Sequence, residues 1–278
     1  MQDNRELQSS DRSPLDYTLL SHKGWVRSNN EDRIMVKDFS AGQNNEHGFA
    51  AVLCDGVGGH QSGEVAAHIG VETVIQQISE SQQFNDPLKL LKNALTSANA
   101  AIINAYADKP GQEGMASTCV AILLIENHLY LANLGDSRAY LLREGKLHQL
   151  NHDHTWLEDS LGAEIGPRKG ITRSHPLAHV LSRYLGSTQL PEIDLRIRSI
   201  EEPVLDELQN QGMPLLNGDR LVICSDGLTD MIDDLEIMEN MNCESSRKNA
   251  QRLVLSALEK GGHDNVSVIV IHVEGLKN

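Results

Sequence analysis

Apolar residues recur along this chain with two different periods, which fall in separate blocks. Residues 62–80 carry them at helical spacing, and a second helical stripe follows Asp86 and Pro87, a favourable cap and first-turn pair. Short strand-like runs separated by turn residues come next, at 118–125, 128–134, 139–142 and 147–150, and predict antiparallel hairpins. The pattern is that of an α+β protein.

Three further apolar runs share one feature, an aspartate at one end. They are 49–54 followed by Asp55, 221–225 followed by Asp226, and the predicted buried strand 266–273 preceded by Asp264. Helical spacing between the last two runs predicts helices near 233–240 and 247–259. If the three strands are neighbours, their three carboxylates converge on one point.

The first of these aspartates opens a loop that contains three glycines within four residues, Asp55-Gly56-Val57-Gly58-Gly59-His60. Glycine permits positive φ and a close backbone approach, so the Asp55 carboxylate and the Gly56 carbonyl can face one point, as ligands of a hard cation would. An equally open alternative is a strand-to-helix turn in which Asp55 caps the helix.

The composition favours one large acidic domain. The chain has 278 residues, and 24 Lys and Arg stand against 39 Asp and Glu, which gives a formal net charge of −15. This balance argues against a nucleic-acid or anionic-membrane partner. The excess of acids leaves room for a carboxylate cluster, which would need metal ions to neutralise it.

The four cysteines show no C-x-x-C spacing, and three of them lie in apolar runs, so we expect buried free thiols. No charged leader with an apolar segment and no 18-residue apolar run is present, so we expect a cytoplasmic protein without a membrane span. Residues 1–14 are polar and patternless and are expected to form a flexible extension before a domain at 15–275.

Three buried carboxylates without counter-ions would be untenable, so Asp55, Asp226 and Asp264 together indicate bound cations. Oxygen ligands without clustered Cys or His favour Mg²⁺ or Mn²⁺ over zinc. Two divalent ions would balance three carboxylates and one hydroxide, and Arg27 would then favour a phosphate dianion. The segment around Arg27, 24–33, taken alone also fits a solvated loop.

Six motifs carry a resemblance to a known family. They are R-x-x-x-E-D at 27–32, D-G-V-G-G-H at 55–60, G-D-S-R-A-Y at 135–140, L-S-R-Y-L-G at 181–186, S-D-G-L-x-D at 225–230 and D-N-V-S at 264–267. In this order they resemble the metal-dependent serine/threonine protein phosphatases of the 2C type (the PPM family), in their compact bacterial form. The resemblance implies an α+β fold, a four-layer α-β-β-α sandwich of two antiparallel sheets flanked by helices, with a flap insertion at about 155–175.

The resemblance also implies roles for the site residues. Asp55 would bridge two tightly bound Mg²⁺ or Mn²⁺ ions, and Gly56 would offer its carbonyl to one of them. Asp226 and Asp264 would hold the other ion. Arg27 would bind the substrate phosphate, so the resemblance makes Arg27, Asp55 and Asp226 the catalytic set.

Four other residues would support this centre. Glu31 and Asp32 would order metal-bound waters, with Asn265 beside them. Asp136 resembles the ligand of a third, weaker ion in bacterial members of the family. Its context leaves an alternative open, because the neighbouring Arg138 could satisfy the Asp136 carboxylate without a metal.

The chain departs from many eukaryotic members at Val57, where they have a histidine that has been proposed as the general acid. His60 follows three residues later, and we expect a structural role for it, because lone histidines are commonly just hydrogen-bonded. Metal-bound water is then the first candidate for the proton donor.

The resemblance implies hydrolysis of phosphoserine and phosphothreonine in proteins by direct attack of a hydroxide that bridges two metals. The expected partners are phosphoprotein substrates of a Ser/Thr kinase, and the expected state is a monomer. The alternative is a pseudophosphatase, a regulatory binding module that has lost its metals. Such proteins usually lack one or more of the aspartates, and none is missing here.

Overall fold

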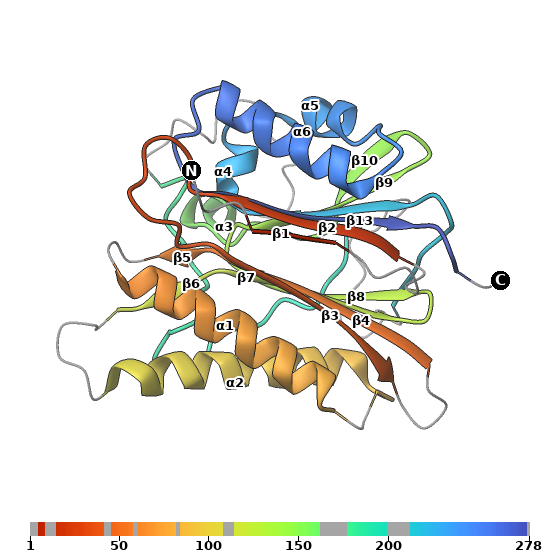
Figure 1. Ribbon diagram of the computed structural model, residues 1–278. Helices are drawn as coiled ribbons and strands as arrows, with labels where there is room; N and C mark the ends of the chain where they lie inside the picture. Colours follow the sequence, from red (N-terminus) through yellow and green to blue (C-terminus); the bar gives the residue numbers. More distant parts are fainter. Residues whose placement is uncertain are drawn as a thin grey trace.

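Two antiparallel sheets lie face to face between two layers of helices in the computed structural model (Figure 1). The structure describes residues 5–8, 15–41, 46–57, 61–81, 84–107, 114–161, 177–198 and 212–276. The four-layer α-β-β-α sandwich expected from the resemblance is therefore confirmed.

The first sheet has six strands in the order β1-β2-β13-β12-β9-β10. Their bounds are Arg5–Gln8 (β1), Leu15–His22 (β2), Val266–Val273 (β13), Arg220–Cys224 (β12), Arg138–Arg143 (β9) and Lys146–Gln149 (β10). β13 lies at the centre and is buried along its whole length, as its apolar run predicted.

The second sheet has five strands in the order β11-β8-β7-β4-β3. Their bounds are Met213–Pro214 (β11), His128–Leu134 (β8), Cys119–Ile125 (β7), Glu46–Cys54 (β4) and Arg33–Ala41 (β3). A separate two-stranded pair, β5 (Gly56–Val57) with β6 (Ala116–Ser117), continues from the end of β4.

The helices cover the outer faces of the two sheets (Figure 1). α1 (Gln61–Ser79) and α2 (Pro87–Ala107) cover the five-stranded sheet, while α4 (Asp226–Thr229), α5 (Asp234–Asn240) and α6 (Ser246–Glu259) lie over the six-stranded one. The predicted cap at Asp86 is confirmed, because its Oδ1 accepts a hydrogen bond from the Lys89 backbone at 3.0 Å. The short α3 (Trp156–Leu161) belongs to the expected excursion after β10.

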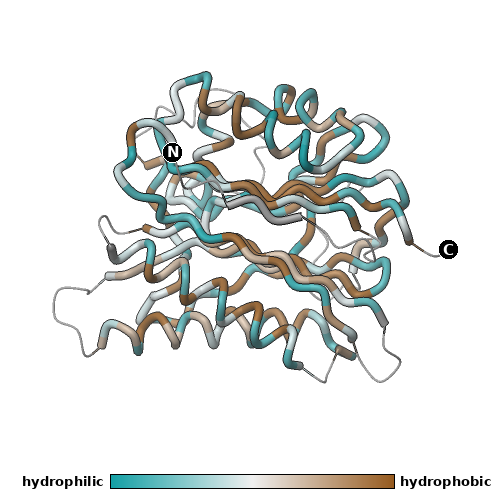
Figure 2. Tube along the Cα trace, in the orientation of Figure 1, coloured by the Kyte–Doolittle hydropathy of each residue, from teal (hydrophilic) through white to brown (hydrophobic). Residues whose placement is uncertain are grey.

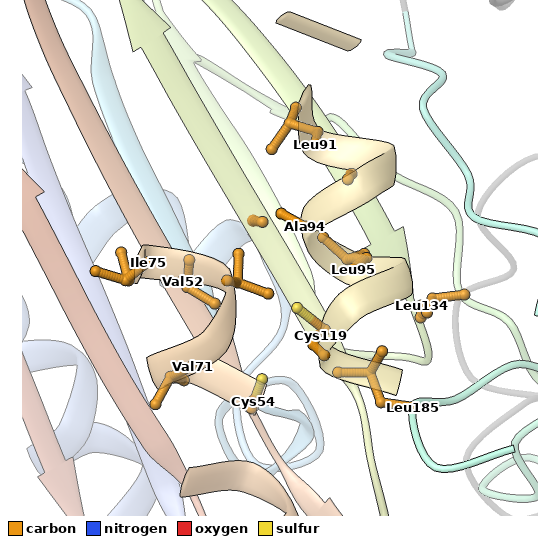
Figure 3. Packing of buried hydrophobic residues seen from close by; sticks show 14 of the residues in the cluster. Val52, Cys54, Val71, Ile75, Leu91, Ala94, Leu95, Cys119, Leu134 and Leu185 are labelled. Atoms are coloured by element: carbon orange, nitrogen blue, oxygen red, sulfur yellow. The ribbon is translucent and has the colours of Figure 1, made fainter. Parts of the chain in front are cut away.

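Hydrophobic side chains fill three layers, one between the sheets and one between each sheet and the helices that cover it. Figure 2 shows the strands as the most hydrophobic segments of the chain, whereas the helices alternate. Figure 3 shows the layer under α1 and α2, where Val52 of β4 lies beside Ile75 of α1, and Leu91 and Leu95 of α2 belong to the same cluster. Truncating such a fully buried aliphatic residue to alanine costs about 2–5 kcal/mol.

Two details differ from the sequence-based expectation. Within the predicted flexible extension, Arg5–Gln8 pairs antiparallel with β2, whose edge offers free backbone groups. The other residues before Leu15 lie outside the described part. The strands that end at the key aspartates are also not all neighbours: β12 and β13 are adjacent, but β4 belongs to the facing sheet.

The three aspartates nevertheless come together, because the ends of all three strands meet at one end of the sandwich. Figure 1 shows α4, which follows β12, and the β5–β6 pair, which follows β4, at this same end. The site is thus built across the two sheets rather than along one.

Candidate metal centre

Asp55 is fixed by its backbone at the end of β4. Its N–H donates to Thr118 Oγ1 at 3.0 Å, and its carbonyl oxygen accepts from the Thr118 N–H at 2.8 Å and from Ser117 Oγ at 2.9 Å. All backbone polar groups of Asp55 are therefore occupied, which leaves its carboxylate as the group that faces the site.

The glycine after Asp55 is required by close packing. A Cβ on Gly56 would lie 2.2 Å from the carbonyl oxygen of Gly63 in α1 and 2.9 Å from the carbonyl oxygen of Glu31. Any side chain here would push α1 and the loop before β3 away from Asp55. The alternative interpretation, Asp55 as a helix cap, does not hold, because Gly56 and Val57 continue as strand β5.

Asp226 and Asp264 come together through a second glycine. Asp226 begins α4 directly after β12, and a Cβ on the next residue, Gly227, would lie 1.9 Å from the carbonyl oxygen of Asn265. The glycine of the recurring Asp-Gly pair therefore has the same role at both places. It lets the backbone of another segment pack directly against the turn that follows the aspartate.

Asn265 ties the loop before β3 to the start of β13. Its Oδ1 accepts from the Glu31 N–H at 2.8 Å, and its Nδ2 donates to the carbonyl oxygens of Lys23 at 2.9 Å and Asn29 at 2.8 Å. Asn265 therefore positions the segment that carries Arg27, Glu31 and Asp32 beside Asp264.

Asp32 is the most deeply buried of the acids in this segment. It is 2% exposed, its Oδ2 accepts from Ser225 Oγ at 2.8 Å, and its Oδ1 has no hydrogen-bond partner in the part of the chain that the structure describes. A buried carboxylate oxygen without a donor is an expensive arrangement unless a cation or a metal-bound water supplies the partner. This oxygen fits the expected metal centre.

The acids of the centre raise one another's pKa. Burial, followed by the charge of Asp230, raises the pKa of Asp226 to about 7, and burial raises that of Asp32 to about 6, partly offset by serine hydroxyls. Burial and then the charges of Asp32 and Asp226 raise the pKa of Asp55 well above its ordinary range. Such a group of carboxylates takes up protons at neutral pH unless cations neutralise it.

Arg27 lies at the exposed rim of the centre. Its Nη2 donates to Asp264 Oδ2 at 2.6 Å, and the guanidinium is about half exposed. This hydrogen bond raises the pKa of Arg27 further, so the side chain is permanently charged. Arg27 is the cation that the sequence analysis predicted near the acidic residues, and its side chain is accessible to solvent.

Asp136 lies next to Asp226, and His179 lies close to both. A carboxylate oxygen from each of them and one ring nitrogen of His179 all lie within 4.8 Å of one another. Arg138 does not pair with Asp136, because it binds Asp153 in a bidentate ion pair, with Nε–Oδ1 at 3.0 Å and Nη2–Oδ2 at 2.6 Å. The alternative in which Arg138 satisfies Asp136 is therefore not supported.

The sequence interpretation missed several residues that complete the site. His179 closes the group around Asp136, Ser225 binds Asp32, and Thr118 binds the backbone of Asp55. Ser225 lies within one of the six motifs and His179 two residues before another, whereas no sequence signal indicated Thr118. His60 and most of the predicted flap, 162–175, lie outside the described residues.

The fold and the sequence of this chain match those of a known family of phosphatases. The family model "Protein phosphatase 2C" matches residues 15–160, and the chain belongs to this family of serine/threonine protein phosphatases. In the described residues, no helix is both long and apolar enough to span a membrane.

The chain is similar to several bacterial phosphatases. The serine/threonine protein phosphatase PstP of Mycobacterium tuberculosis is 34% identical over 93% of this chain, and the chain spans 45% of its length. The serine/threonine phosphatase stp of Listeria monocytogenes is 27% identical over 90% of this chain and 92% of its own. The PstP catalytic domain, solved with two manganese ions, superposes with a TM-score of 0.73 and 32% identity over 94% of this chain and 98% of that one.

Proposed function

We propose that this chain hydrolyses phosphoserine and phosphothreonine in proteins and depends on Mg²⁺ or Mn²⁺. The observation that carries the proposal is the pairing of a buried carboxylate cluster with one exposed arginine at its rim. The manganese ions of the related PstP domain support the choice of metal.

The residues for two ions are present. Asp55 would bridge them, the Gly56 carbonyl would add a ligand to one, and Asp226 and Asp264 would hold the other. When bound, such ions lower the pKa of coordinated water and place positive charge near phosphoryl oxygens. Glu31 and Asp32 would accept hydrogen bonds from water in the centre, which is consistent with the unpartnered Asp32 Oδ1.

Arg27 would bind the phosphoryl oxygens of the substrate. Its guanidinium now contacts Asp264 at 2.6 Å, and a carboxylate oxygen engaged with a cation is a weaker partner for arginine. With cations held by Asp264 and its neighbours, Arg27 would be free to bind the phosphate and to orient the substrate.

We propose that water, not a protein side chain, is the nucleophile. The hydroxyl group beside Asp32, Ser225 Oγ, is fully buried and donates to Asp32. The Cys54 thiol faces the helices, packs against Gly70, and has a pKa raised well above its ordinary range by burial. Acid quenching during turnover of a ³²P-labelled peptide should trap no labelled enzyme, and a labelled enzyme would contradict direct hydrolysis.

The rival function is that of a pseudophosphatase. It is disfavoured because every expected acid is present and because the acids lie close enough to shift one another's pKa. The deciding experiment is hydrolysis of para-nitrophenyl phosphate and of a phosphothreonine peptide after exhaustive chelation, with and without added Mn²⁺ or Mg²⁺. Metal-restored turnover supports the enzyme, and turnover without metal, or none with it, refutes the proposal.

Asp136, with Asp226 and His179, would hold a third and weaker ion. Asp136→Ala should then keep the fold and the pair of tightly bound ions but lower turnover and raise the metal concentration needed for activity. A metal titration followed by activity and thermal melting tests this. A lower melting temperature with an unchanged metal requirement would show a structural role instead.

Four free thiols, three of them buried, support a location in the reducing cytoplasm. The partners would be phosphoproteins produced by a Ser/Thr kinase, and we propose that residues 15–275 act as a monomeric catalytic domain after the 1–14 extension.

A further inference from the structure

Two large apolar side chains stand exposed directly before the rim arginine. Trp25 is 66% exposed and Val26 is 67% exposed, and Arg27 follows. Isolated exposed apolar residues are ordinary, but an adjacent pair beside a binding site needs an explanation.

The indole of Trp25 is held in place although it faces solvent. Its Nε1 donates to the Leu258 carbonyl oxygen at 3.0 Å, its backbone N–H donates to the Gly262 carbonyl oxygen at 2.8 Å, and its ring packs edge-on against His22 at 5.0 Å between centroids. The His22 ring is fixed in turn by a hydrogen bond from the Gly24 N–H to Nδ1 at 3.0 Å. The exposed ring is therefore pre-organised.

A glycine makes room for this ring position. Gly262 follows α6 in the left-handed region, at φ +49°, and a Cβ there would lie 3.0 Å from Trp25 Cδ1. The ring thus lies on the end of α6, against Leu258 and Gly262. A rigid aromatic ring that remains 66% exposed is the kind of group that gains most when a ligand covers it.

The same short loop joins this surface to the catalytic centre. A Cβ on Gly24 would lie 2.2 Å from the Asp264 carbonyl oxygen, so the loop packs on the backbone of a predicted metal ligand. Trp25 and Arg27 are two residues apart, at most about 7 Å between Cα atoms. An extended peptide advances about 3.3 Å per residue, so residues close to a phosphate held by Arg27 would reach the indole.

We propose that Trp25 and Val26 form a docking surface for a large apolar side chain of the substrate, close in sequence to the phosphorylated residue. This inference rests on the proposed phosphatase function. Trp25 and Val26 offer exposed apolar area in the chain between Lys23 and Arg27, and burying that area favours an apolar substrate side chain. The enzyme would thus prefer phosphopeptides with leucine or an aromatic residue near the phosphate.

The test uses one parent phosphothreonine peptide of glycine and serine and a set in which a single leucine is moved from four residues before the phosphothreonine to four after it. With the wild-type protein, the best leucine position should raise kcat/KM about tenfold over the parent peptide. Trp25→Ala should remove this gain and leave para-nitrophenyl phosphate hydrolysis and the parent peptide unchanged. Trp25→Phe, which keeps an apolar ring, should retain most of the gain.

Leu216→Ala is the matched control. Leu216 is 53% exposed but precedes β12, at the end of that strand opposite Asp226, so its loss should leave the leucine gain intact. No gain at any leucine position, or a gain that survives in Trp25→Ala, overturns the proposal. Failure of the proposed function looks different, because neither para-nitrophenyl phosphate nor the parent peptide would then be hydrolysed.

A second measurement does not depend on turnover. The chain has two tryptophans, so Trp156→Phe leaves Trp25 as the single indole emitter. A phosphonate analogue of the best leucine peptide, added with Mn²⁺, should change the emission of Trp25 saturably, and the glycine and serine analogue should do so far more weakly. Emission that is unchanged by the leucine analogue would also overturn the proposal.

Discussion

Asp32 offers a direct test of whether the acidic centre is built for cations. The change is Asp32→Asn, which keeps an acceptor for Ser225 Oγ, bonded at 2.8 Å, and removes one buried charge. Burial raises the pKa of Asp32 from the ordinary value near 3.8 to about 6. Each pKa unit corresponds to about 1.36 kcal/mol, so ionised Asp32 costs the metal-free fold up to about 3 kcal/mol.

The sign of the pH effect follows from the direction of this shift. The folded state holds the proton of Asp32 more tightly than the unfolded state does, so the metal-free protein loses stability as the pH rises from about 4 through 6. The loss is complete by about pH 7, and about half of it is present at pH 5. Removal of the carboxylate removes this dependence.

The assay is thermal melting of chelated protein at pH 5 and pH 8. Since 1 kcal/mol shifts Tm by about 2–4 °C in a domain of this size, Asp32→Asn should melt up to about 6–12 °C above wild type at pH 8, with a smaller gap at pH 5. Saturating Mn²⁺ should stabilise the wild type more than the variant, because the variant lacks the carboxylate that the loaded centre uses.

Asp219→Asn is the matched control. Asp219 is equally buried, at 2% exposed, but its two oxygens accept from Nε and Nη2 of Arg143 at 2.9 Å and 2.5 Å. The substitution removes the ion pair of the half-buried Arg143 guanidinium and should lower Tm with or without chelator. If Asp32→Asn melts at or below wild type at pH 8 without metal, the reasoning about the centre is wrong.

Three further outcomes are expected. Asp226→Asn should lower kcat about 1000-fold, because it disrupts the metal centre, and Arg27→Ala only about 10- to 100-fold, because it mainly disturbs the orientation of the phosphate. Equal losses of kcat for the two variants in steady-state assays would contradict these roles. Native alkylation with iodoacetamide should leave turnover intact, because only Cys243 is partly exposed, whereas substrate-protectable inactivation would indicate a reactive thiol. Burial lowers the pKa of His272 to about 4, so stability that is present above about pH 6.5 should fall as the pH drops to 4. In thermal melts between these pH values, the Tm of His272→Gln should therefore decrease less with falling pH than the Tm of the wild type.

The sequence predicted most of the secondary structure because local patterns decide it. The hairpins, both long helices and the apolar run of β13 follow from period and turn residues alone. The Asp-Gly pairs were informative for a physical reason, since Gly56 and Gly227 both lie where a Cβ would collide with a neighbouring backbone.

The features that the sequence did not reveal depend on contacts between distant residues. Asp32 and Ser225 are 193 positions apart, so nothing local could indicate that Asp32 is buried and bonded rather than solvated. Likewise, no local pattern could indicate that β4 belongs to the sheet facing β12 and β13. Nor could one indicate that His179 approaches Asp136 in the folded chain. A motif locates the chemistry, but the long-range packing decides which side chains complete it.

The loop from Lys23 to Asp32 shows how this packing couples the parts of the site. Its conformation depends on Asn265, whose side chain bonds the Glu31 N–H and the carbonyl oxygens of Lys23 and Asn29. Asn265 is also the residue directly after Asp264, and its own N–H donates to Asp264 Oδ1 at 2.8 Å. The backbone of this loop is therefore attached to the turn that carries Asp264. Any shift of that turn must move the segment that contains Arg27 with it, so the backbone that carries the proposed phosphate-binding residue stays in place beside the backbone that carries the proposed metal ligand Asp264.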